Sequence, residues 1–112
     1  MGVSNMITEQ QVQAALDWMI TNEDAMAKAK ADYHDLDRFS KTIKAELMSQ
    51  VSNNMSVSAR EIEALANQRY ITHLSALREA EQRYLQLEYK MDHNKLICQL
   101  WQTISANKRQ SV

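Results

Sequence analysis

The densest group of residues that could bind a metal ion is the segment from Asp32 to Asp37, which holds three aspartates and one histidine. His34 and Asp37 are three residues apart, so they share one face of a helix. If the chain folds back on itself, His73 comes near them, and zinc accepts such ligands. However, the sequence contains no ligand pair with the spacing H-x-x-x-H or E-x-x-H. We therefore favour a solvated face beside one half-buried histidine, and we expect no metal and no cofactor.

Nucleophilic catalysis would have to use Cys98, the single cysteine of the chain. A cysteine nucleophile needs a base within hydrogen-bond reach, but His93 lies five residues earlier and on a different face of a helix. The sequence also lacks a nucleophile elbow and a phosphate-binding loop, because its only glycine is Gly2. We expect a protein that is not an enzyme.

Basic side chains near an aromatic ring could bind single-stranded nucleic acid through phosphate contacts and stacking on Trp101. The candidates for this contact are Arg38, Lys41, Arg69, Lys108 and Arg109. Against this, 13 basic and 14 acidic residues give a net charge of −1, which is not the balance of a nucleic-acid-binding surface. Lys108 and Arg109 also fall where cations stabilise the end of a helix. Nucleic-acid binding is therefore the alternative hypothesis.

The elements that must position these residues are helices, because one glycine and no proline in 112 residues leave few turns for strands. The hydrophobic spacing predicts helices over about 9–21, 23–51 and 59–106, the last about 48 residues long, with disordered tails at 1–6 and 108–112. The predicted fold is all-α. It is a single domain over residues 1–112, an antiparallel, coiled-coil-like helical hairpin extended by an N-terminal helix.

Capping residues predict where these helices begin. Thr8 with Gln11, and Ser58 with Glu61, have the spacing of a capping box. The polar stretch 21–24 is expected to separate the first two helices, and residues 52–56 are expected to form the loop of the hairpin. Within that loop, the consecutive residues Asn53 and Asn54 can adopt the left-handed conformation that glycine would otherwise supply.

Apolar residues at alternating steps of three and four predict a coiled-coil seam on each arm of the hairpin. On the second helix this seam comprises Met26, Ala29, Tyr33, Leu36, Ser40, Ile43 and Leu47. On the third helix it comprises Ile62, Ala66, Tyr70, His73, Leu77, Ala80, Tyr84, Leu87, Met91, Asn94, Cys98 and Trp101. The expected neighbours across the hairpin are Leu47 with Ile62, Leu36 with His73, Ala29 with Ala80, and Trp18 with Met91.

A second apolar stripe lies beside this seam near the end of the third helix. It is formed by Ile97, Leu100 and Ile104, with Trp101 as an anchor. Two stripes on one helix indicate two neighbours, and a narrow hairpin buries little core. We therefore predict that these four residues form a protein interface in a homo-oligomer, with a dimer favoured, or with another protein.

The chain is expected to reside in the cytoplasm without contact to a membrane. A lone cysteine fits a reducing compartment. The first residues lack the basic start and apolar run of a signal peptide, and the sequence has no apolar stretch near the ~20 residues that span a bilayer.

Three segments resemble a family of small helical phage and prophage proteins: residues 22–31, residues 64–70 and above all residues 100–109. The similarity extends from about Thr8 to Arg109, and its most specific element is the terminal pattern Trp-x-Thr-x-x-Ala-x-Lys/Arg-Arg. Gln102 stands where the pattern usually has arginine. Members of this family tend to be encoded near recombination and replication genes.

The resemblance therefore implies a phage-encoded, non-enzymatic accessory protein in the cytoplasm of the host cell. It would act by protein contact in a DNA recombination or replication assembly or on a host complex.

Overall fold

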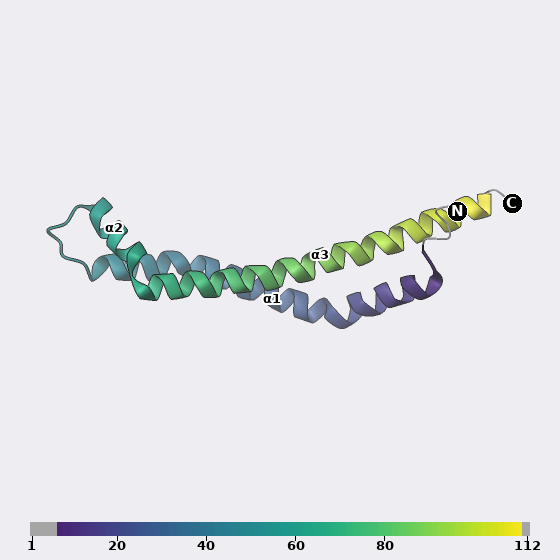
Figure 1. Ribbon diagram of the computed structural model, residues 1–112, viewed down its shortest axis with the longest axis horizontal. Coiled ribbons are helices and arrows are strands. Elements are labelled where there is room, and N and C mark those ends of the chain that lie inside the picture. Colours follow the sequence, from purple (N-terminus) through teal and green to yellow (C-terminus); the bar gives the residue numbers. More distant parts are fainter. Residues whose placement is uncertain (1–6, 111–112) are drawn as a thin grey trace. The chain divides into compact units, whose positions relative to one another are not determined.

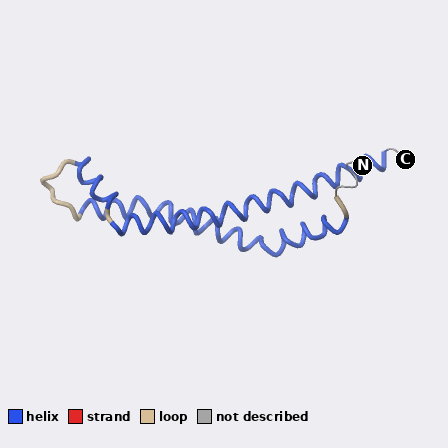
Figure 2. Tube along the Cα trace, viewed as in Figure 1, coloured by secondary structure: helices blue, strands red, loops and turns tan. Residues whose placement is uncertain are grey.

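The computed structural model describes residues 7–110 and contains three helices in that range, α1 (Glu9–Ser49), α2 (Val57–Ala66) and α3 (Gln68–Gln110), shown in Figure 1. Loops join the helices in the described part of the chain, and no strand occurs there (Figure 2). α1 and α3 pack antiparallel with the short α2 between them. The prediction of an all-α antiparallel helical hairpin is therefore confirmed.

The chain divides into two compact units. Unit 1 combines the part of α1 up to Ala27 with the part of α3 from Leu85 onward, and unit 2 comprises Lys28–Tyr84. The predicted tails 1–6 and 111–112 lie outside the described residues. Residues 108–110 were also expected to be disordered, but they belong to the last turn of α3.

The start of α1 follows the predicted capping box. The Thr8 N–H donates to Gln11 Oε1 at 2.8 Å, and the Gln11 N–H donates to Thr8 Oγ1 at 3.2 Å. These two bonds satisfy donors that the first turn of a helix leaves without partners, and they set Glu9 as the first helical residue.

The predicted break at residues 21–24 is wrong, because α1 continues through it without interruption. Asn22 does not cap a new helix. Its side-chain Nδ2 instead donates to the carbonyl of Trp18, one turn earlier, at 2.9 Å. With this amide satisfied inside the helix and neither glycine nor proline nearby, nothing stops α1. The expected separate N-terminal helix is the first part of α1.

The beginning of α2 also differs from the prediction. Its cap is Ser56, whose Oγ accepts from the Ala59 N–H at 3.1 Å, rather than Ser58. Glu61, the expected partner of Ser58, instead forms an ion pair with Lys44 at 2.8 Å. The loop before α2 contains no left-handed residue, since no described residue has a positive φ.

The predicted helix of about 48 residues is broken at Asn67, which separates α2 from α3. Asn67 has an extended backbone (φ −69°, ψ 136°), and its N–H donates to the carbonyl of Ala64 at 3.2 Å. Its side-chain Oδ1 accepts from the Arg69 N–H at 2.8 Å. One residue therefore closes the end of α2 and caps the start of α3.

Unit 2 has its core where α2 meets α1. Ile43, Leu47 and Ala64 are buried there, with Met48 and Tyr70 packed against them. Leu47 thus packs in the cluster of Ala64, whereas its predicted neighbour Ile62 is 68% exposed. The break at Asn67 explains this error, because it changes which face of α2 turns toward α1. From Tyr70 onward, the predicted α3 seam is buried or half-buried throughout.

Unit 1 is held by the outer ends of α1 and α3. Its buried residues are Val12 and Ala15 from α1, and Met91 and Asn94 from α3. Lys90 Nζ lies 5.2 Å from the centre of the Trp18 ring, which agrees with the predicted proximity of Trp18 and Met91. No large side chain among the described residues is fully enclosed. The hairpin therefore buries its apolar residues only partly.

Candidate functional site

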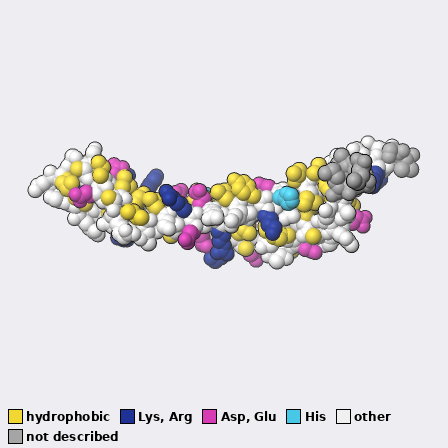
Figure 3. Space-filling view, in the orientation of Figure 1, with side chains coloured by type: hydrophobic (Ala, Val, Ile, Leu, Met, Phe, Trp, Pro, Cys, Tyr) yellow, Lys and Arg dark blue, Asp and Glu magenta, His cyan; other side chains and the backbone are white. Residues whose placement is uncertain are grey.

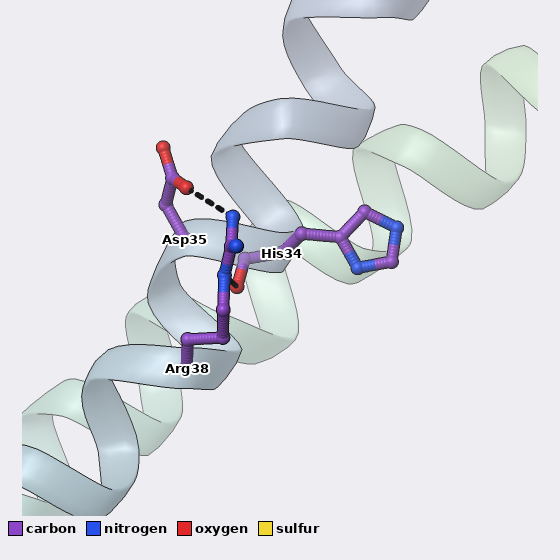
Figure 4. A network of polar contacts seen from close by, with 3 residues as sticks. All are labelled: His34, Asp35 and Arg38. Carbon is purple, nitrogen blue, oxygen red and sulfur yellow. Dashed lines mark hydrogen bonds and ion pairs between the residues drawn. The ribbon is translucent and has the colours of Figure 1, made fainter.

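The two histidines of the candidate metal site have separate environments, and Asp37 is exposed. The His34 ring stacks on Tyr33 at 5.2 Å between centroids and lies 6.3 Å from Tyr84. Figure 4 shows this ring pointing away from Asp35 and Arg38, which pair with each other at 2.8 Å. No group of three or more His, Cys, Asp or Glu side chains in residues 7–110 is placed to hold a metal ion.

The aromatic rings of Tyr33 and Tyr84 stack across unit 2, with centroids 5.8 Å apart. The Tyr33 hydroxyl donates to the Glu81 carboxylate, and this hydrogen bond, together with the negative charge of Glu81, raises the pKa of Tyr33. Likewise, the hydrogen bond to Glu61 and its charge raise the pKa of Lys44. The Tyr33–Glu81 contact in unit 2 thus depends on the hydroxyl proton of Tyr33. The Lys44–Glu61 contact depends on the protonated amine of Lys44.

We expect the protein to lose stability in alkaline solution through these two contacts. Both pKa values are higher in the folded chain than in the unfolded one, where they are about 10. The stabilisation is therefore complete below pH ~10 and is lost as the pH rises through the folded-state values. Thermal unfolding followed by circular dichroism from pH ~9 to ~11 measures the loss. The double variant Tyr33→Phe/Lys44→Met should show a smaller decline, and an equal decline would contradict the assignment.

His73 is a polar residue inside the interface between α1 and α3. It is 8% exposed, and its Nε2 lies 2.7 Å from Ser40 Oγ, while the Phe39 ring meets its edge at 6.1 Å. Ser40 was the single polar member predicted for the α1 seam. The predicted neighbour of His73 was Leu36, so the pairing is displaced by one turn toward Ser40.

Cys98 is half-buried along the α3 seam, as its spacing predicted. His93 is exposed. This position of Cys98 suits a small apolar side chain.

The five candidate residues for nucleic-acid contact are divided between the two units. Arg38 pairs with Asp35, and Arg69 pairs with Glu46 at 2.9 Å, so neighbouring carboxylates neutralise both guanidinium groups. Lys41 is exposed on α1. The remaining two, Lys108 and Arg109, line a hollow of about 710 Å³ in unit 1.

This hollow also brings Trp101 to the beginning of α1. Its lining combines Trp101, Gln102, Ser105 and the two cations of α3 with Ile7, Thr8 and Glu9. The sequence placed Trp101 near Lys108 and Arg109 along the helix. It gave no sign that Thr8 and Glu9 complete the same hollow.

The predicted protein interface is partly covered by the hairpin itself. Ile97, Trp101 and Ile104 are half-buried, whereas Leu100 is 41% exposed. In the same part of α3, the apolar residues Tyr89 and Leu96 are more exposed than any of these, at 66% and 51%. Neither was predicted from the sequence, although their spacing from Leu100, by eleven and four residues, places all three on one side of a helix. Hydrophobic side chains reach the surface in several patches (Figure 3).

A second exposed apolar group lies in unit 2. α2 packs against the core through Ala64 and leaves Val57, Ile62 and Leu65 exposed, by 61%, 68% and 41%. Ile71, in the first turns of α3, is 47% exposed. Both units therefore present large apolar side chains to solvent.

Comparisons with protein families, with curated proteins and with solved structures find no match for this chain. Within residues 7–110, no helix has an apolar stretch of the length needed to traverse a bilayer.

Proposed function

We propose that this protein is a non-enzymatic accessory protein that acts by binding other proteins. The observation that supports this most is the row of Tyr89, Leu96 and Leu100, which are 66%, 51% and 41% exposed along one side of α3. Large apolar side chains gathered on one exposed side of a helix are typical of a surface that binds another protein. Ile97, Trp101 and Ile104, which the sequence predicted as the interface, flank this row and complete the proposed binding surface.

The resemblance to phage proteins supports a setting for this contact. In our proposal the chain works in the cytoplasm of a host cell, within a phage recombination or replication assembly or on a host complex. It acts as a homo-oligomer, with a dimer favoured. The association with recombination and replication genes supports the setting and does not by itself describe a mechanism.

Affinity purification from infected cells, followed by mass spectrometry, tests this function. The double variant Leu100→Glu/Ile104→Glu should lose any partner that the natural chain captures, because burying a carboxylate in an apolar interface is costly. The double variant Gln99→Glu/Gln102→Glu is the matched control, since it also adds two negative charges in the same turns, at exposed positions outside the row. Circular dichroism confirms that each variant keeps its helices. A partner retained equally by all three proteins would contradict the proposed surface.

Single-stranded nucleic-acid binding is the alternative, and the hollow beside Trp101 favours it. There an aromatic ring and two cations, Lys108 and Arg109, line one space that can accommodate a nucleotide. Retention of a labelled single-stranded oligonucleotide, with a steep dependence on salt and a loss in Arg109→Glu, would support it. No retention by micromolar protein at ~50 mM salt would remove it.

A further inference from the structure

One side of α3 in unit 1 carries a stripe of five residues that are spaced three or four apart. This outer stripe consists of Leu85, Tyr89, His93, Leu96 and Leu100, at steps of four, four, three and four residues. At about 100° per residue it lies on the opposite side of the helix from Met91 and Asn94, which are buried against α1. None of its members is an acid, a lysine or an arginine. A second helix can therefore dock there without displacing α1 and without burying a carboxylate or an ammonium group.

The outer stripe exposes large apolar side chains that such a partner would cover. Tyr89 is 66% exposed, Leu96 is 51% exposed and Leu100 is 41% exposed. Since no large described side chain is fully enclosed, a partner would also complete burial that the hairpin leaves unfinished.

We propose that the outer stripe binds the outer stripe of a second copy of this chain, with the two α3 helices antiparallel and centred between His93 and Leu96. This inference rests on the proposed function, because it names the partner for the same side of α3. In this register Tyr89 of each copy lies opposite Leu100 of the other, and His93 lies opposite Leu96. A symmetric contact of this kind buries the outer stripe of both copies at once.

The charges beside the stripe favour the antiparallel direction. Asp92 and Lys95 are exposed, and neither forms an ion pair within residues 7–110. Antiparallel helices centred between His93 and Leu96 bring Asp92 of each copy toward Lys95 of the other, twice across the symmetry axis. A parallel pair would place like charges at the same level and would set the two His93 rings against each other.

Cysteine cross-linking tests both the partner and the direction, in a background with Cys98→Ser. The double variant Tyr89→Cys/Leu100→Cys should form a disulfide-linked dimer on mild oxidation, because the two positions face each other between copies. Tyr89→Cys alone should remain largely uncross-linked, since eleven residues along a helix separate the two copies of position 89 by about 16 Å. Cross-linking by Tyr89→Cys alone would overturn the antiparallel register.

Light scattering on the natural chain gives an independent measurement. We expect the mass of a dimer, and Leu96→Glu should weaken dimerisation by ~100-fold or more. A monomer at ~100 μM, together with no cross-link in either cysteine variant, would overturn the inference.

The proposed function fails separately from this inference. A monomer that captures a partner through Leu100 and Ile104 would leave the function intact and refute the second copy. The chain could instead form a dimer with the predicted cross-link while its interface variants capture every partner as the natural chain does. That result would support the second copy and refute the proposed function.

Discussion

Replacing Leu47 with alanine is expected to lower the free energy of unfolding by about 2–4 kcal/mol. Leu47 is 4% exposed and packs with Ile43 and Ala64 in the core of unit 2, where α2 covers α1. Removing three carbon atoms there leaves a space that neighbouring side chains fill only in part. Urea denaturation followed by circular dichroism at 222 nm measures the difference.

Ile62→Ala is the matched control for this variant. Ile62 was the neighbour that the sequence predicted for Leu47, but it is 68% exposed, so its truncation should change stability by less than about 0.5 kcal/mol. Equal losses for the two variants would restore the predicted register and contradict the break at Asn67.

Ser40→Ala is expected to cost about 1–3 kcal/mol, although it removes only one oxygen atom. Ser40 Oγ is hydrogen-bonded to the Leu36 carbonyl at 3.2 Å and to His73 Nε2 at 2.7 Å, and the direction of the second bond depends on the tautomer of His73. Without the hydroxyl, Nε2 of a side chain that is 8% exposed loses this hydrogen bond. Chemical denaturation gives the size of the loss.

The double variant Ser40→Ala/His73→Leu should recover most of this stability. Replacing both polar partners by apolar groups removes the unsatisfied nitrogen and adds apolar burial. Thr42→Ala, at an exposed position of α1, controls for the change in helix propensity. If the double variant is less stable than Ser40→Ala alone, the pairing of Ser40 with His73 is not the reason for the loss.

Local sequence patterns predicted much of the fold, and three asparagines show what such patterns cannot predict. Asn22 and Asn94 each donate to the carbonyl four residues earlier and stay inside a helix. Asn67 turns the chain and caps α3. An asparagine side chain can bond inside a helix or cap one, so the outcome depends on packing elsewhere. At Asn67 that packing is the contact of Ala64 and Glu61 with α1. The sequence therefore predicted a break at residues 21–24, where α1 continues, and no break at Asn67, where one exists.

The sequence predicted exposed apolar residues near the end of α3, but it did not predict which side of the helix carries them. Apolar spacing directed attention to the last third of α3, and Leu100 is exposed there as expected. The side of α3 that is covered near its end is the side that faces the beginning of α1. Because Thr8 and Glu9 line a hollow with Trp101, the predicted anchor is half-buried in unit 1. Tyr89 and Leu96 are the more exposed residues, and the interface formed by Ile97, Leu100, Trp101 and Ile104 stays a prediction.

Hydroxyl-radical footprinting of Tyr89 and Met91 at low and high protein concentration tests most directly whether α3 has two binding sides. Tyr89 is 66% exposed and Met91 is 8% exposed. We predict that Met91 is protected at both concentrations, and that Tyr89 is modified in dilute protein and protected in concentrated protein. Modification of Tyr89 that does not depend on concentration, or a Met91 as reactive as an exposed methionine, would contradict the account.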